Sequence, residues 1–232
     1  SCPGSAGGSF DVSAIGSVFA GFGRFAKTGP SAWTLTGSNT GTQWSVQGGT
    51  LKVNGSIGGA AARAGTLGGS GNAGAITLGA GGAIAPGNSP GTLSGASLLW
   101  NGGGAMAFEL GAAPSGSDLL ALTGAMSKGT GSGFVFHFSD GAAPPQVGTY
   151  PLISFGSQSG FAASDFSFDY SGSAPALQGH FELKAGGLDF VVTRTAAPVA
   201  AVTPVPTLGE GLLGLLGALL AAAAARRLRR QA

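Results

Sequence analysis

The stretch Gly48-Gly49-Thr50-Leu51-Lys52-Val53-Asn54-Gly55 decides the fold of this chain. Its apolar residues, Leu51 and Val53, alternate with polar ones, which is typical of a β-strand that buries one face. Glycines bracket the strand, and glycine alone takes positive φ without steric cost. The stretch therefore predicts a short strand between two tight corners.

The same unit, an apolar-alternating run of three to five residues followed by glycine, recurs along the first half of the chain. Further copies are Trp33–Leu35, Trp44–Val46, Ala75–Leu78, Leu98–Trp100, Met106–Leu110 and Leu119–Leu122. No helical period lies between them, so an all-β sandwich and a stacked solenoid both fit. The frequent glycine corners favour the solenoid, because its coil must turn every few residues.

The composition supports a packed core. The 232 residues include 46 glycines and 12 prolines, a content that often indicates disorder, but 43% of the residues are hydrophobic. Disordered chains are poor in apolar residues and rich in charge, whereas only 9% of this chain is charged. The glycines follow no Gly-X-Y period, which excludes collagen.

The positive charge is concentrated at the C-terminus, in Arg226, Arg227, Arg229 and Arg230. Residues 1–205 contain seven basic and eight acidic residues. A nucleic-acid-binding protein needs clustered Lys and Arg on its folded part. The sequence therefore predicts no nucleic-acid partner.

A body of residues 1–195 ends in wider, aromatic strands from about residue 134. Phe134, Phe136 and Phe138 share one face by the period of two, and the same pattern continues in Phe166/Phe168/Tyr170, Phe181/Leu183 and Phe190/Val192. The last coil of a solenoid would otherwise expose its core and an unpaired edge. We expect residues 134–195 to form an aromatic-rich C-terminal cap.

Several segments resemble the passenger-associated strand repeat of bacterial autotransporters. They are Phe25–Gly29, Leu35–Gly37, Gly48–Gly55, Gly65–Gly71, Gly81–Leu93, Ser117–Leu119 and Gly148–Ile153. The resemblance implies a right-handed parallel β-helix that is exported to the cell surface. At roughly 20–25 residues per turn, the body would make about eight turns.

Two Gly-rich motifs match catalytic or cofactor patterns only formally. Gly87-Asn88-Ser89-Pro90-Gly91 fits G-x-S-x-G, but that elbow needs the N–H after the serine, and Pro90 has none. Gly69–Gly74 fits G-x-G-x-x-G, but neither a helix nor a well-spaced acid follows it. We interpret the first as a rigid turn and the second as accidental.

Other candidate chemistry is sparse, so we predict no enzyme, no cofactor and no metal site. His137, Ser139 and Asp140 supply the residue types of a triad, but an outer-face histidine is the simpler interpretation. His180 lies beside Gly179 in an expected loop without a metal-ligand partner at recognisable spacing. Cys2 is the only cysteine and allows neither an internal disulfide nor a cysteine zinc site.

Grouped carboxylates would indicate an enzyme, because the enzymes known on β-helices cut polysaccharides with grouped acids, arginines or bound calcium. Asp165 and Asp169, expected on one strand face, are the only close pair in the body. We interpret Asp118, Asp165 and Asp169 as turn and solvent-face residues. A polysaccharide-acting β-helix enzyme remains the alternative.

Residues 196–206 form a Pro/Ala linker, and residues 207–232 form an apolar tail with a basic end. Gly211–Ala225 contains 15 apolar or glycine residues, which as a helix would span about 22 Å, short of the roughly 30 Å hydrocarbon core. Arginines stay on the cytoplasmic side, so Arg226, Arg227, Arg229 and Arg230 would fix the orientation in the inner membrane.

The tail resembles the IPTL-CTERM sorting signal, a class similar to PEP-CTERM tails. The matching residues are Val205, Pro206, Thr207 and Leu208, with valine where the family has isoleucine. The resemblance implies recognition by an exosortase-type sorting protease in a Gram-negative envelope.

Together these observations predict an exported structural or adhesin-like surface protein. It would be anchored in the inner membrane through its C-terminal helix before processing, and then lie at the cell surface, in the outer envelope or outside the cell. Its candidate partners are envelope polysaccharide and a host or neighbouring cell surface.

Overall fold

The structure is a computed structural model that describes residues 6–173, 176–195 and 226. The chain divides into two compact units, Ser1–Ala197 and Pro198–Ala232. In the first unit, hereafter the body, the regular elements are β-strands and three short 3-10 helices, η1(Val12–Ala14), η2(Pro114–Gly116) and η3(Ala163–Asp165).

The strands of the body form three sheets. The eight-stranded sheet has the order β1(Gly8–Asp11), β3(Ala32–Thr36), β5(Thr50–Val53), β7(Thr66–Gly69), β9(Ala83–Pro86), β12(Ala105–Leu110), β15(Phe134–Asp140), β18(Phe166–Tyr170). The seven-stranded sheet has the order β17(Ser157–Ser159), β14(Ala125–Lys128), β11(Ser97–Trp100), β8(Ala75–Leu78), β6(Ser56–Ala62), β4(Ser38–Val46), β2(Phe25–Lys27). The five-stranded sheet has the order β10(Thr92–Gly95), β13(Leu119–Leu122), β16(Gly148–Ser154), β20(Gly187–Thr195), β19(Leu177–Lys184).

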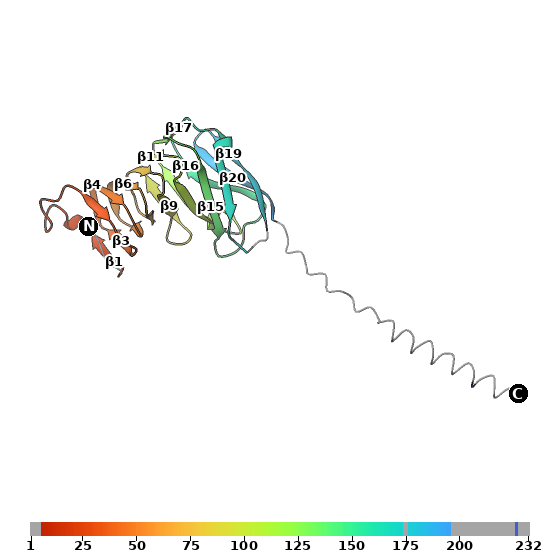
Figure 1. Cartoon of the computed structure of the whole chain (residues 1–232), viewed down its shortest axis with the longest axis horizontal. Coiled ribbons are helices and arrows are strands. Elements are labelled where there is room, and N and C mark those ends of the chain that lie inside the picture. The colour runs from red at the N-terminus through yellow and green to blue at the C-terminus, as the bar shows by residue number, and fades with distance from the viewer. Residues whose placement is uncertain (1–5, 174–175, 196–225, 227–232) are drawn as a thin grey trace. The chain divides into compact units, whose positions relative to one another are not determined.

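The body is a parallel β-helix, as the glycine-cornered strands predict. Strands that follow one another in the chain alternate between sheets, while neighbours within the two long sheets pair in parallel. Figure 1 shows the result, with coils stacked from the N-terminal end of the body towards the strands of the C-terminal end. All of the strand segments predicted between Trp33 and Leu122 lie in strands.

The eight strands of the first sheet agree with the expected number of about eight turns, but individual coils are shorter or longer than the expected average of roughly 20–25 residues. Leu51 pairs with Leu67, 16 residues later, whereas Met106 pairs with Phe136, 30 residues later. In the short coils the third face is only a row of isolated bridges, Ser56 to Asn72 and Asn72 to Ser94. In the longer coils, additional residues form strands of the five-stranded sheet.

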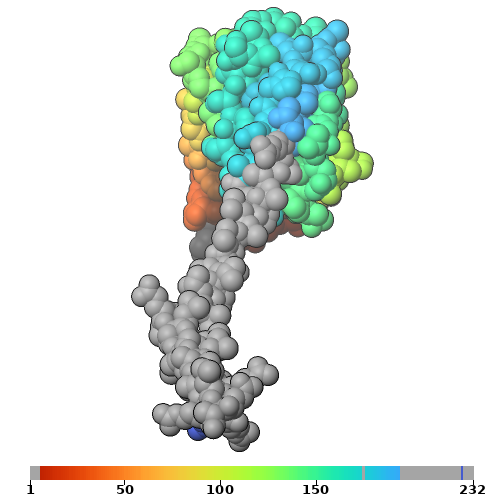
Figure 2. Space-filling view, turned by 90° about the vertical axis from the view of Figure 1, so that its right-hand side faces the viewer, coloured from red at the N-terminus to blue at the C-terminus, as the bar shows by residue number. Residues whose placement is uncertain are grey.

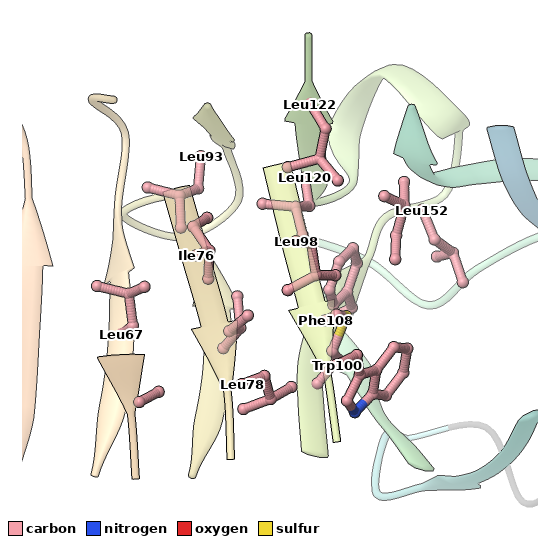
Figure 3. Packing of buried hydrophobic residues seen from close by; sticks show 14 of the residues in the cluster. Leu67, Ile76, Leu78, Leu93, Leu98, Trp100, Phe108, Leu120, Leu122 and Leu152 are labelled. Carbon is pink, nitrogen blue, oxygen red and sulfur yellow. The ribbon is translucent and has the colours of Figure 1, made fainter. Parts of the chain in front are cut away.

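Inward-facing side chains stack in register along the coil axis. In the eight-stranded sheet one column contains Leu51, Leu67, Ile84, Met106 and Phe136, all fully buried. Figure 3 shows how the side chains of such columns from different sheets, among them Leu67, Ile76 and Leu98, meet in the interior. Each coil packs only against its neighbours, and such columns together make the core continuous along the body.

Gly74 shows why corners between coils need glycine. Its φ is +62°, and a Cβ at this position would collide with the main-chain carbonyl of Gly58 in the preceding coil. A side chain would therefore meet both backbone strain and a steric clash.

The C-terminal end is closed by the aromatic cap that the sequence predicts. There β16, β20 and β19 pair antiparallel, which ends the parallel ladder. Phe138 and Phe190 lie 4.7 Å apart between ring centroids, and Phe136 and Phe181 lie 5.2 Å apart. In Figure 2, which views the body from this end, the later residues cover much of the near face.

Candidate functional site

A shallow groove lies on the outer face of the seven-stranded sheet, over the first four strands in chain order, β2, β4, β6 and β8. Its volume is about 700 Å³. Alternate residues of each strand face outward, and they form a floor of small side chains in which Ser45, Ala61 and Thr77 occupy one column. The lining residues are Gly23, Arg24, Phe25, Ala26, Gln43, Trp44, Ser45, Gln47, Ala60, Ala61, Arg63, Ala75 and Thr77.

Four long polar side chains flank this floor. Arg24 directly precedes β2 and Arg63 directly follows β6, while Gln43 lies on β4 and Gln47 directly follows it. All four residues are exposed. Among the residues that the structure describes, neither arginine forms an ion pair with a carboxylate.

The coils around the groove contain no acidic residue after Asp11, which ends β1 in the first coil. From Val12 to Phe108 the sequence has no Asp or Glu, whereas Arg24, Lys27, Lys52 and Arg63 all fall within this range. Counting charge over the whole body conceals this asymmetry, because the acids are concentrated in the later coils. A count over windows of the chain would have revealed it.

Lys27 adds a buried positive charge at the same end of the body. Its side chain is fully buried, and Nζ donates hydrogen bonds to the carbonyl oxygens of Thr28 and Gly29, both at 2.8 Å, and of Gly48 at 3.0 Å. An ammonium group has three donors, so these carbonyls satisfy it completely. No carboxylate neutralises its charge within the described part of the chain.

A second candidate site is a corner cavity of about 230 Å³ that Ser89, Glu109, Asp118 and Ser139 help to line. Asp118 is only 2% exposed, so its interpretation as a solvent-face residue is wrong. Its carboxylate accepts hydrogen bonds from the main-chain N–H of Gly91 at 2.7 Å and of Glu109 at 2.8 Å. Buried polar groups in proteins are hydrogen-bonded, and these two main-chain donors supply the partners that Asp118 needs.

The environment of Asp118 raises its pKa to about 6. The main cause is burial, which disfavours the charged form, and the nearby Glu109 carboxylate acts in the same direction. The two main-chain N–H groups oppose the shift, because they stabilise the charged form.

Ser89 lies in the turn of the formal G-x-S-x-G match, and its partner differs from that of a serine nucleophile in a triad. Its φ is +87°, and its Oγ donates a hydrogen bond at 3.0 Å to Oε1 of Glu109. In a Ser-His-Asp triad the serine hydroxyl would instead contact a histidine. The other carboxylate oxygen, Oε2 of Glu109, is buried without a hydrogen-bond partner. The corner acts chemically as a polar connection between coils.

His137 lies on the outer face of β15, as expected, and its Nδ1 lies 2.7 Å from Oδ2 of Asp169 on β18. Asp140 instead contacts the hydroxyl groups of Tyr170 and Ser173. The histidine and the aspartate that were considered for a triad therefore have different partners.

Two further expectations are wrong. His180 lies in strand β19 and not in a loop, and its Nε2 is 3.5 Å from Oε1 of Glu182. Asp165 ends η3 and binds Lys128 at 2.6 Å, whereas Asp169 lies in β18, so the two aspartates do not share a strand face. In the described ranges, no group of three or more His, Cys, Asp or Glu side chains could hold a metal ion.

The predicted sorting and orientation residues are not tested by this geometry. Val205, Pro206, Thr207, Leu208, Arg227, Arg229 and Arg230 lie outside the described residues, as do Cys2 and the linker. Arg226 is exposed and has helical backbone conformation. Within the part of the chain that the structure describes, no helix has both the length and the apolar character needed to cross a membrane.

Comparison with known proteins gives no assignment. No protein-family model matches the chain, and no curated protein matches it in sequence.

Proposed function

We propose that this chain is an exported cell-surface protein whose β-helix serves a structural or adhesin-like role. The observation that carries the proposal is the groove between Arg24 and Arg63. It offers cationic and amide side chains on an open sheet face, and its lining residues include no Asp, Glu or His. Such a surface is suited to binding without catalysis, because it supplies no carboxylate or imidazole for general acid–base chemistry.

The proposed location in the cell envelope is inferred from the C-terminal tail. Val205–Leu208, the apolar run and the arginines support transient insertion in the inner membrane and processing by an exosortase-type protease. The parallel β-helix is compatible with this location, because it provides a long exposed surface.

A polysaccharide-acting enzyme is the second candidate, and the corner cavity is the observation in its favour. A carboxyl group with a pKa of about 6 could act as a general acid. However, both oxygens of Asp118 accept main-chain hydrogen bonds, and Oε1 of Glu109 accepts one from Ser89. We therefore favour the binding role.

Surface location can be tested in a Gram-negative host that processes related tails. A peptide tag inserted in the exposed loop at Ser132, between β14 and β15, should be labelled by antibody on intact cells. The same tag on a cytoplasmic protein serves as the control for cell lysis. Recovery of the tagged chain only from the cytoplasm would contradict export.

A further inference from the structure

The groove between Arg24 and Arg63 has the charge of a site for an anionic ligand. The two guanidinium groups stand on opposite sides of a floor of small side chains and lack carboxylate partners among the described residues. Lys27 adds an uncompensated charge on β2, the first strand under the groove. With no acid between Val12 and Phe108, Asp11 at the end of β1 is the one acidic residue of these coils, against the basic residues Arg24, Lys27, Lys52 and Arg63, so their net charge is positive.

The dimensions favour an extended ligand. Gln43 on β4 and Gln47, which directly follows β4, are four residues apart, a distance of about 13 Å along the strand direction. Strands β2 and β6 are two strand spacings apart, about 10 Å. Arg24 and Arg63 therefore lie at diagonal corners with roughly 16 Å between their backbones. The groove is also open, so a polymer can enter and leave it along the sheet.

The low density of cations distinguishes among anionic polymers. A nucleic acid carries one phosphate per about 3.4 Å along each strand, so the groove would leave most of the phosphates that cross it without a cation. An acidic polysaccharide carries its carboxylates on sugar rings with many hydroxyl groups between them. Gln43 and Gln47 offer amide donors and acceptors for those hydroxyls, and arginine binds carboxylates in bidentate geometry.

We propose that this groove binds a linear polysaccharide that carries carboxylate groups. The proposal rests on the proposed function, which it makes specific by naming the partner class, and it requires binding without cleavage. Arg24 and Arg63 bind carboxylates of separate sugar residues, while the small side chains of Ser45, Ala61 and Thr77 let the chain of sugars approach the sheet.

The test measures binding of fluorescently labelled hyaluronan oligosaccharides, which carry one carboxylate per disaccharide, to the full-length chain in a nonionic detergent. Arg24→Gln and Arg63→Gln should each weaken binding at least about fivefold, and the double variant at least about twentyfold. Lys52→Gln is the matched control, because it removes one positive charge from the outer face of the other long sheet. Its affinity should change less than about twofold, and higher ionic strength should weaken binding by the wild-type chain.

Four outcomes would overturn the proposal. They are no binding by the wild-type chain, an equal loss in Lys52→Gln, equal affinity for the carboxyl-reduced, neutral oligosaccharide, and tighter binding of duplex DNA. Unchanged far-UV circular dichroism and thermal unfolding midpoints would show that the variants are folded. The binding experiment uses purified protein, whereas the export experiment uses cells. A failure to bind the polysaccharide can therefore be distinguished from a failure of export.

Discussion

The carboxylate of Asp118 accepts a hydrogen bond at 2.8 Å from the main-chain N–H of Glu109, nine residues earlier in the chain. The same carboxylate holds Gly91, which ends the Gly87–Gly91 turn. A single buried side chain thus connects β12 with the turn before β10, and its protonation state bears on the stability of the body.

The pKa shift of Asp118 predicts a pH-dependent contribution to the free energy of unfolding. A folded-state pKa of about 6, against the ordinary pKa of 3.8 for an aspartate, means that the folded chain binds the proton more readily than the unfolded chain. The contribution of Asp118 is therefore largest below about pH 4 and falls as the pH rises to about 6, by on the order of 1–3 kcal/mol. Urea unfolding of the wild-type chain and Asp118→Asn at pH 4–7 should show their difference changing by this amount. Parallel curves would contradict the prediction.

Replacing Lys27 with methionine should destabilise the body by about 2–4 kcal/mol. The substitution preserves most of the volume but leaves the carbonyls of Thr28, Gly29 and Gly48 without their donor. Lys52→Met, at a partly exposed position on the neighbouring sheet, should cost less than about 0.5 kcal/mol. Urea unfolding measures both, and equal effects would show that the buried hydrogen bonds contribute little.

Gly74→Ala should cost at least about 2 kcal/mol, because it adds backbone strain at positive φ to a clash with the carbonyl of Gly58. Gly23→Ala provides the control, since nothing lies within 4 Å of the Cβ it would add. Thermal unfolding should leave the midpoint of Gly23→Ala within a few degrees of the wild-type value. A similar midpoint for Gly74→Ala would show that the coils can separate at this corner without cost.

Phe138→Ala should destabilise the aromatic cap by about 3–5 kcal/mol. Phe138 is fully buried and its ring lies 4.7 Å from that of Phe190, so truncation removes packing between the last coils and the closing hairpin. Leu99→Ala, at a position 42% exposed, should cost less than about 1 kcal/mol. Chemical unfolding monitored by circular dichroism would measure both, and a small loss at Phe138 would mean that the cap is not integral to the body.

In a host with a matching sorting protease, intact-mass analysis should find a mature chain that lacks residues from about Thr207 onward. Pro206→Ala with Thr207→Ala should leave the uncut form in the membrane fraction, because the recognised backbone segment is altered. Pro198→Ala with Thr203→Ala changes the same residue types in the linker and should be processed normally. A mature wild-type chain that ends at Ala232 would contradict the sorting signal.

Local pattern was sufficient to predict most of the fold. The alternation in Thr50–Val53 and the glycines beside it depend on backbone geometry within a few residues, so the strands and corners follow directly from the sequence. The period of two in Phe134, Phe136 and Phe138 likewise predicted the inward face of β15, which the structure confirms.

The candidate site depended on relationships between coils. Arg24 and Arg63 are 39 positions apart, and only the stacking of β2, β4 and β6 brings them to one groove. Asp118 follows a short loop and has the sequence context of a surface turn, but the hydrogen bonds from Gly91 and Glu109 bury it. Residue type and neighbours in the sequence determine whether a strand forms, whereas the pairing register between successive coils determines which distant side chains meet.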